Sequence, residues 1–318
     1  MSAVLPVKSL ARSYATPSTV AEALELARSH SGGCEYSAGG TDLHPLRQQE
    51  LHSKPVVIDL CGIGELRRLR VLESSIEMGS LVTLDELISN PAVKQACPLM
   101  VEAALSVGTP VIRKTATVGG NLLVNNRCTY YNQSKPWRTA VGSCLRDVGD
   151  TCLVTGVKHG KCFSRHVSDM APALIALDTE VTIRNQHSTF SIPLSQLYVQ
   201  DGIRCVSHLE DDGILENIRV FAKVKHWWYR KLRLRQSLDF TSLTVAATAD
   251  SLGMVRICLN GVAMAPILIS GQQSELTLDG IIKQARLKAK LVDNDLLPLP
   301  YRQEMTAAYL EELWNDFQ

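Results

Sequence analysis

Two glycine turns decide the fold of this 318-residue chain: Ser37-Ala-Gly-Gly-Thr-Asp-Leu43 and Thr117-Val-Gly-Gly-Asn-Leu122, about 75 residues apart. Each places adjacent glycines before a polar residue and an expected helix start. Because glycine has no side chain, the backbone N–H groups of such a turn can approach and bind an anion. Two turns of this kind can hold one diphosphate, although each doublet alone is also typical of an ordinary turn or helix C-cap.

Neither turn has the spacing of the common nucleotide-binding motifs. Neither is Gly-x-Gly-x-x-Gly, and neither carries the Gly-Lys-Ser/Thr ending of a phosphate-binding loop. The sequence therefore argues against a standard Rossmann domain.

The composition is typical of a folded protein without a nucleic-acid partner. Hydrophobic residues make up 45% of the chain and charged residues 20%, which is enough apolar surface for two or three packed units. The 33 Lys and Arg residues balance the 32 Asp and Glu residues, and no dense basic stripe is present. We therefore expect no DNA or RNA partner.

The sequence predicts a cytoplasmic protein without a membrane partner. The first residues lack the basic segment and apolar run of a secretory signal, and no 18 consecutive residues are apolar. In a reducing compartment, nine cysteines are not expected to form a disulfide framework. Their expected uses are metal ligation, redox chemistry or burial.

The hydrophobic pattern predicts three parts with mixed helices and strands: residues 1–60, 61–212 and 213–318. The first begins with a capped amphipathic helix, in which Glu follows a Thr cap three residues later, and ends in a buried strand. An acidic turn precedes the last part, where we expect a small antiparallel sheet and two helices, over residues 276–287 and 301–317.

Residues 126–167 interrupt the second part and contain four of the nine cysteines. They show no period of 2 or 3.6 residues, and a loop this long normally needs an internal crosslink or a function. The cysteines are Cys128, Cys144, Cys152 and Cys162. Four thiolates are the ligand set of a tetrahedral zinc ion or a cubane iron–sulfur cluster. The spacing of the four cysteines does not distinguish between the two. Unrelated free cysteines are a third interpretation, and His159 and His166 are alternative ligands.

The two glycine turns resemble the FAD-diphosphate loops of the flavoprotein subunits of molybdenum hydroxylases, the xanthine dehydrogenase and carbon monoxide dehydrogenase group. The resemblance extends over nearly the whole chain. Ser168 and Asp169 match a flavin-contacting Ser-Asp pair of that family, and Lys231 matches a lysine beside the cofactor. The resemblance implies an α+β fold: a two-part FAD-binding domain of the PCMH-like type with an inserted iron–sulfur loop at 126–167, followed by a C-terminal α+β domain.

The resemblance also implies which residues bind the cofactor. They are Tyr36, Ser37, Ala38, Gly39, Gly40, Thr41, Asp42, Leu43, Val107, Thr117, Val118, Gly119, Gly120, Asn121, Asp169, Leu215 and Lys231. The residue types suit the role, since glycines admit the diphosphate while hydroxyl, amide and carboxylate groups can bond it or the cofactor hydroxyls. Three of them have a second interpretation: Asp42 as a helix-start residue, and Val107 and Leu215 as ordinary core.

The irregular loop resembles an insertion of the flavoprotein (beta) subunits of 4-hydroxybenzoyl-CoA reductases. The run Arg127-Cys-Thr-Tyr-Tyr-Asn-Gln-Ser-Lys-Pro-Trp-Arg138 carries this resemblance, as do the residues just before Cys144 and Cys152. In that family the loop binds a [4Fe-4S] cluster through four cysteines, which correspond to the four in this loop. Three aromatic residues are then expected to pack around the cluster: Tyr130, Tyr131 and Trp137.

By resemblance, the chain is an electron-transferring subunit of a heterotrimer or its dimer, with no catalytic substrate site of its own. The implied partners are a molybdopterin-binding large subunit, a [2Fe-2S] small subunit and a ferredoxin-like electron donor. The implied reaction is reductive dehydroxylation of 4-hydroxybenzoyl-CoA. Two alternatives stay open: a related molybdenum hydroxylase with another substrate, and a non-enzymatic, zinc-stapled assembly subunit.

Overall fold

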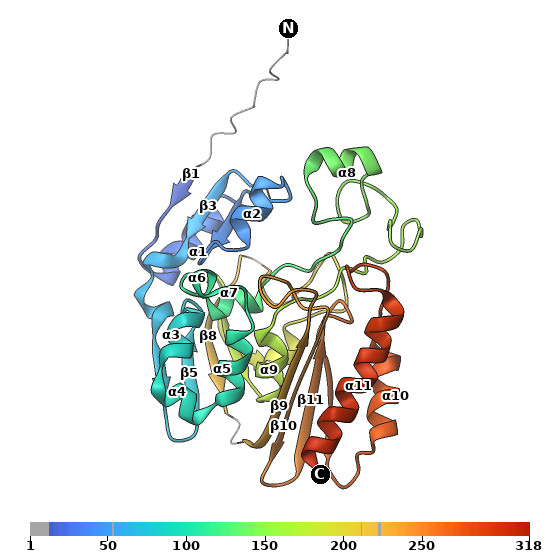
Figure 1. The fold of residues 1–318 in the computed structure, drawn as a ribbon. Coiled ribbons are helices and arrows are strands. Elements are labelled where there is room, and N and C mark those ends of the chain that lie inside the picture. The colour runs from blue at the N-terminus through green and yellow to red at the C-terminus, as the bar shows by residue number, and fades with distance from the viewer. Residues whose placement is uncertain (1–12, 53, 211, 222–223) are drawn as a thin grey trace.

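Three β-sheets with helices packed around them form the mixed helix and sheet architecture that the sequence predicts (Figure 1). The structure is a computed structural model, and it describes residues 13–318 apart from 53, 211, 222 and 223. No helix among these residues combines the length and the apolar character that a membrane span needs.

The N-terminal sheet is parallel, with the strand order β1-β3-β2. Its elements in chain order are β1 (Ser13–Ala15), α1 (Val20–Ser29), β2 (Cys34–Ser37), α2 (Leu43–Gln48) and β3 (Val56–Asp59). Thr19 caps α1 as expected, accepting a hydrogen bond from the backbone N–H of Glu22 at 3.1 Å. The Glu22 carboxylate binds the backbone N–H of Ser18, so the capping box is only half formed. The first glycine turn lies between β2 and α2, at the carboxyl end of β2.

The second sheet is antiparallel, with the order β4-β5-β8-β6-β7. Its strands are β4 (Leu69–Val71), β5 (Ile76–Gly79), β6 (Glu180–Arg184), β7 (Thr189–Pro193) and β8 (Ile214–Val220). Short 3₁₀ helices flank it: η1 (Leu60–Gly62), η2 (Gly64–Arg67) and η3 (Leu194–Gln196). Although β8 follows the predicted boundary at 212/213, it pairs with β5 and β6. The division into three parts stays a prediction.

The helices that follow β5 position the second glycine turn. They are α3 (Leu84–Ser89), α4 (Pro91–Ala96), α5 (Pro98–Leu105), α6 (Pro110–Arg113) and α7 (Val118–Leu122). Thr117 caps α7 by accepting a hydrogen bond from the Gly120 N–H at 3.0 Å. The Gly119 N–H donates to the backbone oxygen of Ser80 at 2.9 Å, so both glycine N–H groups of α7 already have a partner within the chain.

The C-terminal sheet is antiparallel, with the order β12-β11-β10-β9. It comprises β9 (Val224–Leu232), β10 (Leu243–Asp250), β11 (Met254–Asn260) and β12 (Ile267–Gln272). Helices α10 (Leu278–Lys288) and α11 (Leu299–Phe317) pack on one face through Ile281, Leu310 and Leu313. They match the two helices that the hydrophobic period predicts.

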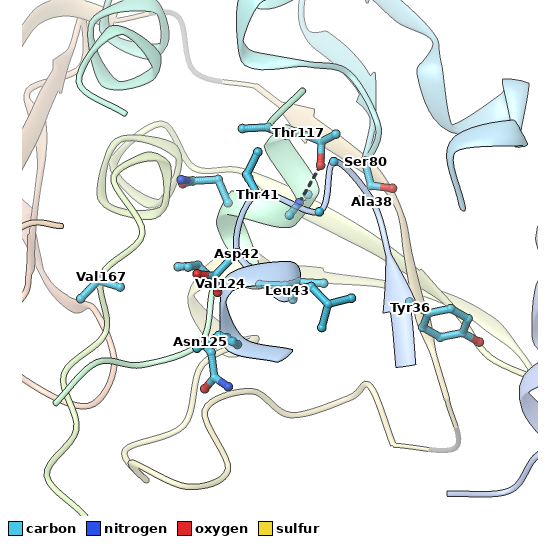
Figure 2. Close-up of a pocket in the computed structure, with 18 of the residues that line it drawn as sticks. Tyr36, Ala38, Thr41, Asp42, Leu43, Ser80, Thr117, Val124, Asn125 and Val167 are labelled. Carbon is cyan, nitrogen blue, oxygen red and sulfur yellow. Dashed lines mark hydrogen bonds between the residues drawn. The ribbon is translucent and has the colours of Figure 1, made fainter. Parts of the chain in front are cut away.

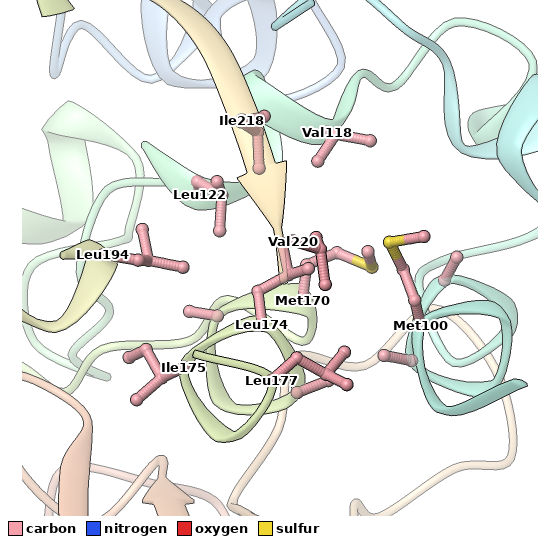
Figure 3. Packing of buried hydrophobic residues seen from close by; sticks show 14 of the residues in the cluster. Met100, Val118, Leu122, Met170, Leu174, Ile175, Leu177, Leu194, Ile218 and Val220 are labelled. Carbon is pink, nitrogen blue, oxygen red and sulfur yellow. The ribbon is translucent and has the colours of Figure 1, made fainter. Parts of the chain in front are cut away.

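Helix α9 (Met170–Ala176) lies in the largest core and joins the C-terminal sheet to the rest. Every residue of α9 is buried. Figure 3 shows Met170 and Leu174 among side chains from α5, α7 and β8. On its other side α9 contacts β10 and β11. Burying a side chain of this size stabilises the fold by about 1.5–3 kcal/mol, so α9 fixes the position of Asp169 directly before it.

The insertion at residues 126–167 has one regular helix, α8 (Lys135–Val141). A two-bond bridge closes its base, because the backbone groups of Arg127 and Arg165 exchange hydrogen bonds of 2.8 and 2.9 Å. Buried Arg138 donates to the backbone oxygen of Gln49 at 3.0 Å, directly after α2. Figure 1 shows α8 extending away from the sheets. Hydrogen bonds therefore hold the loop at its base and at α8, while the internal crosslink expected through the four cysteines stays a prediction.

Candidate functional site

Both glycine turns line one cavity of about 590 Å³, a volume within the range of cofactor sites (Figure 2). Three of the residues implied by the resemblance are not among those that line it: Ser37, Val118 and Lys231. Ser37 and Val118 are buried behind the wall, at 2% and 0% exposure. The other implied residues all line the cavity, including Val107 and Leu215. Val107 and Leu215 are also buried in the main core, as their second interpretation has it, and their contact with a cofactor stays a prediction.

The glycines allow the two turns to pack backbone against backbone. A Cβ atom on Gly39 would overlap the carbonyl oxygen of Thr115, two residues before the second turn. A Cβ on Gly119 would collide with Ser80, directly after β5. Gly40 has φ 68°, a left-handed conformation that favours glycine. A side chain at Gly39 would push the two turns apart, while one at Gly119 would displace Ser80.

Asn121 ties the second turn to the start of α9. Its side-chain oxygen accepts hydrogen bonds from the Ser168 hydroxyl at 2.8 Å and from the Met170 N–H at 3.1 Å. Because the oxygen is engaged, the amide of Asn121 keeps its N–H groups for a ligand in the cavity. Ser168 and Asp169 therefore lie beside the second glycine turn, and Asp169 also lines the cavity.

Asp169 has one paired and one unpaired carboxylate oxygen. Oδ2 accepts a hydrogen bond from Lys231 Nζ at 2.7 Å, and both side chains are about 95% buried. Oδ1 is buried and has no hydrogen-bond partner among the described residues. Burial raises the pKa of the Asp169 carboxyl, and the charge of Lys231 opposes that rise. A buried, unpaired oxygen on a residue that lines the cavity can accept a hydrogen bond from a cofactor hydroxyl. Lys231 does not line the cavity and holds Asp169 through the other carboxylate oxygen.

Asp42 contacts the insertion. It occupies the N-cap position of α2, but its side chain makes no capping hydrogen bond. It forms an ion pair with Arg127, whose guanidinium also lies 4.5 Å from the centre of the Phe240 ring. Burial lowers the pKa of Arg127, and Asp42 opposes this shift. Arg127 is not among the lining residues and contacts the cavity wall through Asp42, whereas Val167, the last residue of the insertion, lines the cavity itself.

The cavity has a further group of polar lining residues that the sequence did not single out. Glu35, His52, Asn125 and Cys205 all line the cavity. His52 Nδ1 lies 3.1 Å from the Glu35 carboxylate, and its Nε2 lies 3.1 Å from the Asn125 amide nitrogen. Burial lowers the pKa of His52, and nearby arginines lower it further. Glu35 lies in β2 and the other three come from separate loops, so no local pattern marks the group.

The four cysteines of the insertion line a second, much smaller cavity. Each is buried, between 6% and 9% exposed. Tyr130 and Tyr131 also line this cavity, as expected, while Trp137 packs on Tyr130 with 6.4 Å between ring centres and is 37% exposed. Neither alternative histidine is among the residues that line it: His166 bonds Asn260 at 3.1 Å, and His159 is exposed.

The donor chemistry of the second cavity fits a metal centre, while its present geometry is not that of ligation. Among the described residues, no group of three or more His, Cys, Asp or Glu side chains is arranged to hold a metal ion. Burial raises the pKa of Cys128 to about 11 and also raises that of Cys162. Burial acts in the same direction on Cys152, but hydrogen bonds from Thr155 and from the backbone of Val154 and Phe163 together outweigh it and lower the pKa. Four thiols around one cavity remain the donor set of a cubane cluster.

Solved structures share this fold. Carbon monoxide dehydrogenase from Hydrogenophaga pseudoflava, in a form that lacks the Mo-pyranopterin moiety of the molybdenum cofactor, contains a chain that aligns with a TM-score of 0.72. The alignment covers 96% of both chains at 20% identity. Quinoline 2-oxidoreductase from Pseudomonas putida 86 aligns with a TM-score of 0.69 over 96% of both chains, at 16% identity.

Sequence relatives extend the likeness to the family. The model described as "FAD binding domain in molybdopterin dehydrogenase" matches residues 8–220. The aldehyde oxidoreductase FAD-binding subunit PaoB of Escherichia coli (strain K12) is 31% identical, covering 83% of this chain and 85% of that subunit. The carbon monoxide dehydrogenase medium chain of Hydrogenophaga pseudoflava is 24% identical, covering 86% and 82%. This chain therefore belongs to the family of FAD-binding subunits of molybdenum hydroxylase-type oxidoreductases.

Proposed function

We propose that this chain is the electron-transfer subunit, carrying FAD and a [4Fe-4S] cluster, of a molybdenum-dependent complex similar to 4-hydroxybenzoyl-CoA reductase. The observation that carries the proposal is the convergence of four cysteines, spread over 35 residues of an inserted loop, on one buried cavity. Family membership alone accounts for the flavin and not for this loop. The resemblance of the loop supports the cluster and the reaction.

FAD would occupy the larger cavity, with its diphosphate at the two glycine turns. Thr117 can donate its hydroxyl hydrogen there, because its oxygen already accepts the cap bond from Gly120. Asn121 N–H groups and the unpaired oxygen of Asp169 suit cofactor hydroxyls. Val107 and Leu215 offer apolar contact to the ring system. When bound, the flavin supplies the redox chemistry, and the chain binds and orients it.

The cluster would be held by the four cysteines of the smaller cavity. When bound, it transfers single electrons, and its surroundings set its potential. Tyr131, Leu153 and Val154 line the cavity with ring and aliphatic atoms, which limit the access of water. Arg127 closes the base of the loop through its backbone and pairs with Asp42, which lines the FAD cavity. The base of the loop would thereby hold the cysteine cavity beside the FAD cavity.

The proposed partners follow from the resemblance. They are a molybdopterin-binding large subunit, which would carry the substrate site, and a [2Fe-2S] small subunit, in a heterotrimer or its dimer. Relatives named as a subunit and a medium chain support such an assembly. A ferredoxin-like donor would pass electrons through the cluster and FAD to the partners. These electrons would then drive the reductive removal of the phenolic hydroxyl of 4-hydroxybenzoyl-CoA at the large subunit.

A second candidate keeps the flavoprotein and changes the substrate. Relatives named for aldehyde oxidation and for carbon monoxide dehydrogenation show that this subunit type serves complexes with different substrates. Copurification of the partner subunits and activity with 4-hydroxybenzoyl-CoA separate the two candidates. Activity with another aromatic or heterocyclic compound, and none with this thioester, would favour the second.

Replacement of one cysteine tests the cluster. Cys144→Ser should remove the iron and leave FAD bound, because the two cavities have separate linings. Cys61→Ser is the matched control, since Cys61 lies outside the insertion and a serine hydroxyl can keep its hydrogen bond to the Ala38 oxygen. Loss of both iron and flavin from a folded Cys144→Ser protein would refute two independent sites. A wild-type protein that is colourless and contains zinc would favour the zinc-stapled assembly subunit.

A further inference from the structure

Arg146 connects the two cavities. Its guanidinium belongs to the lining of the cysteine cavity and lies 4.4 Å from the centre of the Tyr131 ring. The same group donates to the backbone oxygen of Asn126 at 2.8 Å and to the side-chain oxygen of Asn125, which lines the FAD cavity. One side chain thus contacts the walls of both cavities.

The charge of Arg146 is not matched by a carboxylate in the part of the chain that the structure describes. Its partners there are the two asparagines, the Tyr131 ring and the Cys205 sulfur at 3.8 Å. The other arginines of the insertion each pair with a carboxylate. These pairs are Arg127 with Asp42, Arg138 with Asp147, and Arg165 with Asp295. An arginine stays protonated in proteins, so a fixed positive charge remains beside the four thiols.

The contact with Asn125 also orders the wall of the FAD cavity. Because the Asn125 oxygen accepts from Arg146, its amide nitrogen faces His52 Nε2 and donates to it at 3.1 Å. His52 must then carry its hydrogen on Nδ1, where it donates to Glu35 at 3.1 Å. Arg146 thereby sets the orientation of a hydrogen-bonded row that ends in the cavity wall.

We propose that Arg146 is a positioning residue that joins the cysteine loop to the FAD cavity and raises the reduction potential of the iron–sulfur cluster. This inference rests on the proposed cluster. Four thiolates make the cluster anionic, and reduction adds a further negative charge, so an uncompensated cation nearby favours the reduced form. Asn125 and Tyr131 hold the guanidinium at the boundary between the cavities.

The test is an anaerobic redox titration of the whole chain with its cofactors, following the cluster by electron paramagnetic resonance and the flavin by absorbance. Arg146→Gln should shift the cluster to a lower midpoint potential, while Arg146→Lys, which keeps the charge, should stay near wild type. Lys135→Gln is the charge-matched control. It removes one positive charge from the same loop, at an exposed residue that pairs with Glu50 and is not among those lining either cavity.

An Arg146→Gln protein with full iron and FAD and an unchanged cluster potential would overturn the inference, and so would an equal shift in Lys135→Gln. If Arg146→Gln loses its iron, Asn125→Asp replaces it as the test. The added carboxylate neutralises the charge of Arg146 in place and should lower the midpoint potential of the cluster. An unchanged potential in Asn125→Asp would overturn the inference. Wild-type protein without iron would instead refute the proposed cluster, so the two failures are distinguishable.

Discussion

Gly39 shows at the scale of one residue why the turns are built from glycine. A Cβ on Gly39 would overlap the Thr115 carbonyl oxygen, which is backbone and cannot rotate away. We therefore expect Gly39→Ala to separate the two turns, to weaken FAD binding at least about tenfold and to cost about 1–3 kcal/mol of stability. Flavin fluorescence titration measures the first effect and thermal unfolding the second.

Gly64→Ala is the control for this prediction, because a Cβ on Gly64 would meet no atom within 4 Å. It should bind FAD like the wild type. Equal FAD affinity in Gly39→Ala and wild type would show that the close packing of the turns is not needed for the cofactor.

Lys231 supports Asp169 from behind the cavity, and both side chains are about 95% buried. Lys231→Met should leave a buried carboxylate without its partner, which costs about 3–5 kcal/mol, and should lower the temperature of unfolding by several degrees. The double variant Asp169→Asn with Lys231→Met should recover part of this loss, since no buried charge remains. A single variant as stable as wild type would contradict the role of the pair.

Individual site residues were predictable where the signal is local. Asp169 and most residues of the two glycine turns stand in short stretches that carry their own pattern, and they line the cavity. His52 and Asn125 were missed because they meet only through the folded chain, 73 residues apart. Arg127 stands in the run that carries the resemblance of the insertion, but no local pattern predicts its ion pair with Asp42, which depends on the path of the insertion.

At the scale of elements, His166 connects the end of the insertion to the C-terminal sheet. It is fully buried, bonds Asn260 at the end of β11, and packs edge-on against Tyr198. Burial lowers the pKa of His166 to about 4. Since the unfolded histidine titrates near pH 6.5, its contribution to stability is complete above that pH and is lost as the pH falls toward 4.

His166→Gln should therefore flatten the dependence of stability on pH. Between pH 6.5 and 4, the unfolded wild type binds one proton more at this residue, which changes the folding equilibrium about tenfold per pH unit. Glutamine cannot be protonated but can still donate to Asn260. Urea unfolding across this pH range measures the slope, and exposed His187 provides the control variant His187→Gln. An unchanged slope in His166→Gln would contradict the assignment.

The elements that the sequence predicts best carry a one-sided hydrophobic period. Helices α10 and α11 are amphipathic and were expected within a few residues of their observed ends. The irregular insertion was also expected, because it lacks any period. The position of β8 was not: its neighbours β5 and β6 are distant in the chain, and strand order depends on such long-range pairing.

At the scale of the whole molecule, segments next to each of the three sheets and the base of the insertion together form the proposed FAD cavity. Turns after β2, β5 and β9 line it together with the start of α9. The cysteine cavity lies beyond this wall, reached through Arg146 and Asn125. A cofactor in each cavity would place two redox groups in one rigid frame. The proposed electron-transfer role of the chain requires such an arrangement.

The most direct test of this account is the cofactor content of the wild-type chain purified without oxygen. Flavin, iron, acid-labile sulfide and zinc are measured per chain in the same sample. The account predicts about one FAD with about four iron and four sulfide atoms, and flavin bands on a broad iron–sulfur absorbance. One FAD with zinc in place of iron, or with no metal at all, would contradict it.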